Sequence, residues 1–527
     1  MAGLRAAGIG IALAASAGAA PGQADVRALA VTWTEGPLGP SGSGTFGQIL
    51  PPPLPATPER LLFIVNPHGL PPGGPRSMSI WSHGAEGNVL EFDPDARLVS
   101  IGATGVYPEI QLPGPGGFGP DGGGIVGIAA MPTLGHPELM EWWRVGGEEP
   151  ELVLSTEFGP ALPEGGIPWT RWVDFEELRT NGRGDVAWLT EVAVPGEGWG
   201  YEAVVRVSGG KVDLPAPYGT PLPGGRVLER HQSQGIGLGA EGEVYAVMSV
   251  STWPPPPPKG LVIRVSADPE EEVAVLGEAS FGRFFGARPS IGTYAWLGAP
   301  EWGLYHLTPD SARLVVGWDD LPARGGMSNG TRVNGVVLGG DEPALLIGTA
   351  AGQNVIWRAA DGGFETVVET GDEVLIDGVP RLIDPGSAVL GSDGSILFQN
   401  LLSAGPWEIL RFKGGTFSRV LSVGGEITLS GGDVGVVETI GAWGEPIAGD
   451  EAVVFVTLAD RREALLALRV SPDCGADFDG SGAADVNDLL GYLGAFRSGD
   501  PAADLDGDGA VGVSDLLAFL GAFRAGC

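Results

Sequence analysis

Oxygen-bearing residues recur at a fixed spacing in two stretches near the end of the chain, beginning at Asp477 and, 27 positions later, at Asp504. A 12-residue calcium loop supplies oxygens from positions 1, 3, 5, 7, 9 and 12, with Gly at position 6 for the turn. Those ligand positions are Asp477, Asp479, Ser481, the Ala483 carbonyl, Asp485 and Asp488 in the first loop, and Asp504, Asp506, Asp508, the Ala510 carbonyl, Gly512 and Asp515 in the second. The spacing predicts two Ca²⁺ ions, with a water at Gly512, which has no side-chain oxygen.

Each loop is followed by apolar residues at helical spacing. The pattern is i, i+1, i+4 and i+7 in both copies: Leu489, Leu490, Leu493 and Phe496, then Leu516, Leu517, Leu520 and Phe523. Such spacing is typical of one apolar helix face. We therefore expect two short helices whose apolar faces pack together. An acidic turn without a metal ion is the alternative, but two matches at a fixed offset favour the metal.

The stretch 474–527 resembles a dockerin domain, of the variety that ends in Gly-Cys and anchors secreted bacterial proteins. The paired acidic loops, each followed by an apolar helix, carry the resemblance. It implies a small, paired EF-hand-like helical domain that folds with calcium and has a protein partner or anchor. Cohesin-binding dockerins commonly carry Ser-Thr at loop positions 10 and 11, where this chain has Val486-Asn487 and Val513-Ser514. The partner's identity therefore stays open.

The N-terminal segment predicts export. In residues 1–24, Arg5 precedes a weakly apolar run and then small residues, which is typical of a signal peptide. A disordered N-terminus is the alternative. No other stretch reaches the length of a membrane span, so none is expected in the mature chain. We predict a protein that is secreted or lies at the cell surface.

The chain has two cysteines, Cys474 and Cys527, which bracket the calcium loops. In an exported protein an even count at such positions predicts a disulfide. The alternatives are two free thiols, or a terminal Cys527 that carries a lipid or a partner chain.

The composition narrows the class of protein. The net charge is −35, from 65 acidic and 30 basic residues, so nucleic acid and anionic membranes are not expected partners. The chain has 90 Gly and 45 Pro, which alone would suggest disorder, but 43% of its residues are hydrophobic and 15 are Trp. A turn-rich, mostly β structure reconciles these numbers.

Residues 25–470 contain an internal repeat. An apolar–Arg step lies in a short predicted strand, before a Gly or acidic turn and a second strand. It occurs at Arg144, Arg206, Arg264, Arg358, Arg411 and Arg469, with degenerate copies at Glu91 and His306. These eight markers recur at a mean step of about 54 residues, a period typical of repeat architectures. Units of this length predict a β-propeller of about eight four-stranded blades.

The ends of the repeat predict how the ring closes. The eighth unit stops at Val470 without its outermost strand, and the mature chain begins with such a strand. We expect Ala28 to Trp33 to pair beside Leu465 to Val470, because closure removes exposed sheet edges. The recurrent arginines are expected to pair with carboxylates of the same or the next blade. A ring of arginines that binds anions is the alternative.

The string NGRGDVAW, from Asn181 to Trp188, resembles the NxxGxxAF tandem-repeat family of bacterial surface proteins. This resemblance implies a secreted repeat protein with variable anchors. It implies no known reaction.

No catalytic constellation is predicted. The GxSxG string from Gly326 to Gly330 lies in a Gly-rich turn and lacks the strand and helix of a nucleophile elbow. We predict a secreted calcium-binding protein whose propeller is a non-catalytic recognition or structural module. The loop residues Trp199 and Trp253 leave a carbohydrate ligand open, because exposed aromatic rings can stack on sugars. The alternative is a secreted polysaccharide-active enzyme that the tail brings to its site.

Overall fold

The computed structural model describes part of the chain. Up to Phe285 it describes the strands given below and residues 150, 181, 185, 209, 214–215, 220, 236, 239–243 and 273. From 292 to 470 it describes all residues except 299–300, 323–330, 341, 377, 402–406, 430–432 and 448–450. In the tail it describes 476, 478, 486–503, 505 and 510–525. The predicted signal peptide, the GxSxG string, Trp199 and Trp253 lie outside the described residues.

The described strands form eight sheets. The first contains β2 (Gln48–Thr57), β3 (Arg60–Asn66), β4 (Ser79–Gly84) and β5 (Gly87–Phe92). The second contains β6 (Tyr107–Gln111), β7 (Gly124–Met131), β8 (Leu139–Val145) and β9 (Glu151–Ser155). The third contains β10 (Ile167–Pro168), β11 (Arg179–Thr180), β12 (Val186–Ala193), β13 (Gly200–Ser208) and β14 (Lys211–Asp213). The fourth contains β15 (Pro221–Leu222), β16 (Arg226–His231), β17 (Gly237–Leu238), β18 (Val244–Ser251), β19 (Gly260–Val265) and β20 (Ala274–Ala279).

The other four sheets follow in chain order. The fifth contains β21 (Gly282–Phe285), β22 (Thr293–Gly298), β23 (Trp302–Thr308) and β24 (Ser311–Gly317). The sixth contains β25 (Arg332–Gly339), β26 (Glu342–Ala350), β27 (Gln353–Ala360) and β28 (Gly363–Glu369). The seventh contains β29 (Glu373–Ile376), β30 (Val379–Leu382), β31 (Pro385–Leu390), β32 (Ile396–Asn400), β33 (Glu408–Lys413) and β34 (Thr416–Ser422). The eighth contains β35 (Glu426–Thr428), β36 (Val434–Ile447), β37 (Glu451–Leu458), β38 (Glu463–Arg469) and β1 (Val26–Val31).

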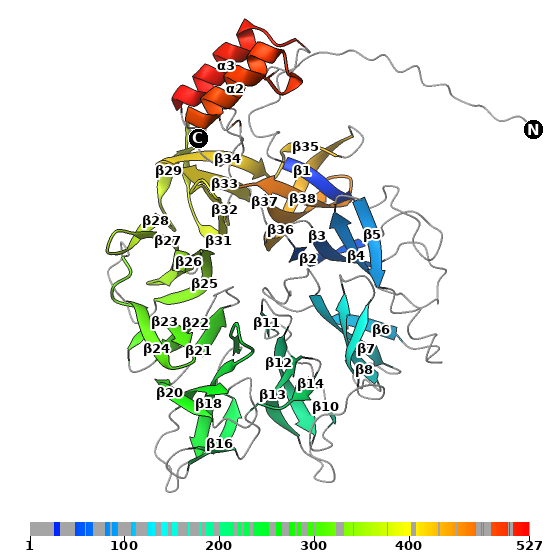
Figure 1. Ribbon diagram of the computed structural model, residues 1–527, viewed down its shortest axis with the longest axis vertical. Coiled ribbons are helices and arrows are strands. Elements are labelled where there is room, and N and C mark those ends of the chain that lie inside the picture. Colours follow the sequence, from blue (N-terminus) through cyan, green and yellow to red (C-terminus); the bar gives the residue numbers. More distant parts are fainter. Residues whose placement is uncertain are drawn as a thin grey trace, which may run out of the picture.

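The sheets follow one another around a ring, as Figure 1 shows. Within the described residues the strand pairs are antiparallel, apart from a single parallel bridge between Ile376 of β29 and Phe417 of β34. Antiparallel sheets of about four strands repeated around a centre are the arrangement of a β-propeller. The predicted mostly β, propeller-type fold is therefore confirmed.

The N-terminal strand pairs with the last strand of the body. In the β1–β38 pair, Val26 lies opposite Leu468 and Val31 opposite Ala464. An ion pair of 2.9 Å joins Arg27 of β1 to Glu451 of β37. The predicted pairing is confirmed, with the strand beginning at Val26 and not at Ala28. The eighth sheet thus combines strands from the two ends of the body.

Burial patterns explain why inner and outer strands differ in sequence. Every residue of β22 and of β32 is buried. Such strands are covered on both faces and can be almost continuously apolar. By contrast, β24 and β28 begin with alternating exposed and half-buried residues, as expected of a strand with one face in water.

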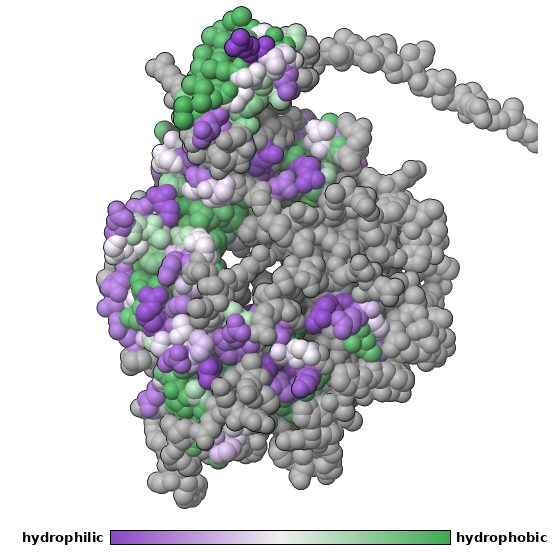
Figure 2. Space-filling view, in the orientation of Figure 1, coloured by the Kyte–Doolittle hydropathy of each residue, from purple (hydrophilic) through white to green (hydrophobic). Residues whose placement is uncertain are grey.

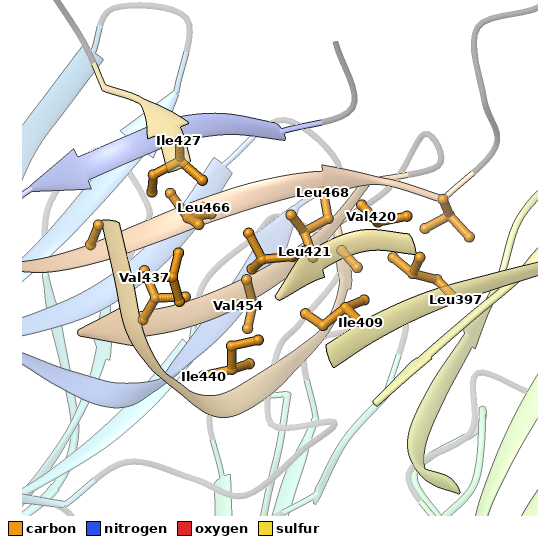
Figure 3. Packing of buried hydrophobic residues seen from close by; sticks show 14 of the residues in the cluster. Leu397, Ile409, Val420, Leu421, Ile427, Val437, Ile440, Val454, Leu466 and Leu468 are labelled. Atoms are coloured by element: carbon orange, nitrogen blue, oxygen red, sulfur yellow. The ribbon is translucent and has the colours of Figure 1, made fainter. Parts of the chain in front are cut away.

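The core consists of layers between neighbouring sheets. Figure 3 shows one layer, in which Leu397 and Ile409 of the seventh sheet face Val454 and Leu466 of the eighth. Other buried clusters likewise join the third and fourth, fourth and fifth, fifth and sixth, and sixth and seventh sheets. From the third to the eighth, neighbouring sheets therefore pack face to face.

The recurrent arginines form cross-strand ion pairs. In three sheets the arginine on one hairpin strand lies directly opposite an acidic residue seven positions later on the next strand: Arg144–Glu151, Arg206–Asp213 and Arg358–Glu365. Two arginines also reach the following sheet. Arg206 Nη1 donates to the Gly242 carbonyl at 2.9 Å, and Arg411 Nε donates to the Val470 carbonyl at 2.8 Å. The expected structural role is confirmed at these positions.

One repeat marker is out of register. From Arg144 to Arg411 the marker lies in the first strand of a hairpin, but Glu91 lies in β5, the second strand of the β4–β5 hairpin. Gly84 pairs with Gly87, so this turn comes before the marker and not after it. The assignment of Glu91 is therefore wrong by one strand.

The turn at Asn181 joins two sheets. The Asn181 side-chain amide accepts from the Asp185 N–H at 3.0 Å and donates to the Gly239 carbonyl, in the next unit, at 2.8 Å. Gly239 begins a similar turn, in which its N–H donates to the Glu243 carbonyl. The asparagine of the NxxGxxAF-like string therefore stabilises its own turn and positions the neighbouring one.

Within the described part of the chain, no helix combines the length and the apolar character needed to cross a membrane.

Candidate metal centre

Two helices in the tail begin at equivalent positions of the two acidic loops. Helix α2 spans Val486–Ser498 and α3 spans Val513–Ala525, so each starts at loop position 10; a short 3-10 turn, η4 (Pro501–Ala503), lies between them. Asp488 and Asp515 lie in the first turns, where a negative charge stabilises the helix dipole. Gly499, at φ 69°, ends α2, because glycine adopts this left-handed conformation without strain.

The two copies pack on each other through equivalent residues. Tyr492 and Phe519, at the same position of each copy, stack with ring centroids 4.0 Å apart and ring planes within 2°. Ala476 and Ala503, also equivalent, join them in one fully buried cluster. Tyr492 thus meets its own counterpart, as expected of a pseudo-twofold pair.

The predicted apolar helix faces are only half correct. Leu489, Phe496, Leu516 and Phe523 pack against the buried cluster, as expected. Leu490, Leu493, Leu517 and Leu520 are instead 64, 40, 65 and 42% exposed. Adjacent residues on a helix point about 100° apart, so two consecutive leucines cannot share one narrow face. The aromatic residues Tyr492 and Phe519, which the prediction omitted, determine which face is buried.

The last predicted ligand of each loop is fully buried. Asp488 and Asp515 are both 0% exposed. Asp515 Oδ1 accepts from the Leu505 N–H at 2.8 Å, and its Oδ2 accepts from the Gly512 N–H at 2.7 Å. Leu505 and Gly512 are loop positions 2 and 9, so this carboxylate holds the start and the end of the loop together.

Two predicted ligands of the second loop lie near Gly512. A Cβ atom built on Gly512 would stand 3.9 Å from the Ala510 carbonyl oxygen and 3.9 Å from Asp515 Oδ2. The carbonyl of position 7 and the carboxylate of position 12 therefore both lie near loop position 9. Carbonyl and carboxylate oxygens are the donors that Ca²⁺ prefers, so the residues present fit this ion.

The other predicted ligands and both cysteines lie outside the described residues. They are Asp477, Asp479, Ser481, Ala483, Asp485, Asp504, Asp506, Asp508, Cys474 and Cys527. Among the residues that are described, no group of three or more His, Cys, Asp or Glu side chains is placed to hold a metal ion. The two calcium sites and the disulfide accordingly stay predictions.

The phenol of Tyr492 couples the two copies electrostatically. Burial raises its pKa, and the nearby Asp515 carboxylate of the other copy raises this pKa further. Its hydroxyl donates to the Ala503 carbonyl at 3.4 Å. A cation beside Asp515 would offset part of the carboxylate's effect on Tyr492.

Comparison with known proteins gives no family. No protein-family model matches the chain, and no curated protein matches its sequence.

Solved structures with a similar chain path include three kinds of protein. The β-propeller domain of the Trilobed protease from Pyrococcus furiosus is 10% identical, with a TM-score of 0.35, covering 81% of this chain and 96% of that one. The acylaminoacyl peptidase of Pyrococcus horikoshii is 11% identical, with a TM-score of 0.38, covering 82% of this chain and 53% of that one. The exotype rhamnogalacturonan lyase YesX is 11% identical, with a TM-score of 0.36, covering 85% of this chain and 76% of that one.

Proposed function

We propose that this chain is an exported calcium-binding protein, secreted or held at the cell surface. Its propeller serves as a non-catalytic recognition or structural module. Its C-terminal dockerin-like tail binds two Ca²⁺ ions and anchors or assembles the protein through a partner.

The symmetric burial of Asp488 and Asp515 carries the calcium part of the proposal. Both carboxylates are removed from water at the same position of the two loops. Burying a carboxylate costs free energy unless hydrogen bonds or a cation offset it. The loop segments 477–488 and 504–515 contain four Asp each and no Lys or Arg, so a dissolved cation is the natural counter-charge. Calcium suits a set made of carboxylate and carbonyl oxygens.

The body is proposed to be a closed propeller of eight blades. Eight sheets in the described residues and the β1–β38 pairing support this count. The pairing covers the edge of β38, and β1 becomes the outermost strand of the eighth sheet. A disulfide between Cys474 and Cys527 would add a covalent link across the calcium module.

Calorimetric titration of the full chain with Ca²⁺ tests the metal assignment. We expect two ions per chain, and one ion for either Asp488→Asn or Asp515→Asn, since each substitution removes a ligand charge with little change in shape. Asp185→Asn is the matched control: Asp185 is a buried aspartate of the body, 4% exposed, and two ions should still bind. No calcium binding by the unaltered chain would refute the calcium proposal, and two ions in both tail variants would refute the assignment of Asp488 and Asp515 as ligands.

A further inference from the structure

A second apolar stripe runs along each tail helix on the side exposed to water. In α2 its residues are Val486, Leu490 and Leu493, with exposures of 62, 64 and 40%. In α3 the counterparts in the second copy are Val513, Leu517 and Leu520, with exposures of 69, 65 and 42%. Figure 2 shows hydrophobic surface running along this pair of helices at the top of the view. We call these six residues the exposed stripe.

The spacing within the exposed stripe is that of a helix–helix seam. In each helix the apolar residues are separated by four and then three positions, which is the alternation of the a and d positions of a coiled coil. The helices already bury their other apolar face in the core around Tyr492 and Phe519. Each helix therefore has a second apolar face, which the packing within the tail does not bury.

Charge does not oppose contact at this surface. The only acidic residues in the two helices are Asp488 and Asp515, and both are fully buried. The chain's net charge of −35 is therefore carried elsewhere. Exposed apolar surface without carboxylates is unusual on so acidic a protein and marks a contact surface.

We propose that a second copy of this chain covers the exposed stripe, with two tails packing seam against seam as a four-helix bundle. Each tail carries the exposed stripe on two helices, and an a/d stripe packs on the a/d stripe of another helix. A twofold dimer requires one patch that matches itself, and the stripe meets this condition because its two halves occupy equivalent positions of the two copies.

The area of the exposed stripe limits the expected affinity of the dimer. A helix of 13 residues is about 20 Å long, and two side by side are about 20 Å wide, so each copy offers about 400 Å². The two copies together would bury about 800 Å², which is less than a stable interface needs. We expect a dimer that dissociates at tens of micromolar and forms where copies are concentrated, as at a surface.

Sedimentation velocity of the full chain in Ca²⁺, from about 2 to about 400 µM, tests the proposal. We expect the mass to rise from one chain to two across this range. The double variant Leu490→Glu, Leu517→Glu should stay at one chain throughout, because four glutamates would meet in the seam. The control Leu375→Glu, Leu382→Glu alters leucines that are 64 and 53% exposed on the β29–β30 hairpin and should dimerise as the unaltered chain does.

Circular dichroism and calcium titration of the same samples separate this inference from the proposed function, on which it rests only through the folding of the helices. A chain that binds two ions, has folded helices and stays monomeric to about 400 µM overturns the dimer alone. Loss of the dimer in the hairpin variant, with the stripe variant unaffected, also overturns it. Helices that fold and dimerise in chelator would refute the calcium proposal and leave the dimer standing.

Discussion

The body and the tail differ in the counter-charges that their own sequences supply. In the body, Arg206 is 1% exposed and is neutralised by Asp213 across the hairpin, with a further hydrogen bond to the Gly242 carbonyl. In the tail, the loop segments 477–488 and 504–515 contain four Asp each and no Lys or Arg. The body therefore carries counter-charges within the chain, whereas the proposed calcium ions would supply them to the tail loops from solution. Stability of the body should be independent of metal ions, and stability of the tail should depend on them.

The two regions also repeat differently. The markers of the body are unevenly spaced, since the step from Arg144 to Arg206 is much longer than the step from Arg264 to His306, whereas the tail repeats once with nearly the same sequence. A sheet in the ring packs on two different neighbours, so its loops and edges can diverge. In the tail Tyr492 stacks on its own counterpart Phe519, so a change of either ring alters the packing of the other copy.

Removing calcium should have the largest effect on stability, and it should affect the tail but not the body. With excess chelator we expect loss of the tail's helical circular dichroism, because repulsion among the loop carboxylates is no longer offset. The melting transition of the body, followed by differential scanning calorimetry, should not move. A shift of the body's transition of more than a few degrees would contradict the contrast between the regions.

Deleting the closing strand β1 should destabilise the body and leave calcium binding by the tail unchanged. Removal of residues 25–34 leaves one edge of β38 unpaired and exposes the face that Leu29 covers, since Leu29 is 6% exposed. We expect a loss on the order of 5 kcal/mol, with aggregation on heating. Calcium stoichiometry should stay at two. Removal of residues 1–24 alone is the control, and an equal loss in that control would exclude strand pairing as the cause.

Two arginines allow a matched test of burial within the body. Arg206→Met should cost about 3 kcal/mol in urea unfolding, because it leaves Asp213 and the Gly242 carbonyl without their buried donor. Arg358→Met breaks an equivalent pair with Glu365, but those side chains are 38 and 50% exposed, so the cost should be below about 1 kcal/mol. Equal costs would mean that the cross-strand pair matters and the link to the next sheet does not.

Tyr492→Phe should have the smallest effect. Its counterpart in the second copy is Phe519, so the core tolerates this ring, and below pH 9 we expect a change under about 1 kcal/mol. The raised pKa of Tyr492 stabilises the folded tail below about pH 10, where an unfolded tyrosine is still neutral, and this stabilisation is lost as the pH rises further. Residues 474–527 contain no other Tyr and no Lys.

Alkaline titration of the tail's helical circular dichroism, with calcium present, measures the loss of the stabilisation by Tyr492. The helices of the unaltered chain should be lost at lower pH than those of Tyr492→Phe. Identical alkaline midpoints would show that the phenol does not titrate in the buried core.

Local patterns predicted the fold better than they predicted its contacts. The hairpins at Arg144, Arg206 and Arg358 follow from an apolar strand and a turn at fixed spacing, and the β1–β38 pairing follows from a last unit that lacks its outer strand. The links between sheets could not be predicted in the same way. Arg206 and Arg411 donate to backbone carbonyls of other units, and every residue type carries such a carbonyl.

The tail shows where spacing alone is insufficient. Leu489 and Leu490 are equally apolar neighbours, yet the first packs on the core and the second is 64% exposed. The choice depends on the stacking of Tyr492 and Phe519, a contact between copies that no periodicity within one helix reveals.

The pairing of β1 with β38 sets the order in which the body can be completed. The strand Val26–Val31 leaves the ribosome first among the body's strands, and its partner around Leu465 follows only at the very end of the body. Seven sheets can form from local hairpins as they emerge, but the joint must wait for nearly the whole chain. The ring of a nascent chain therefore cannot close until the last strand of the body has been synthesised.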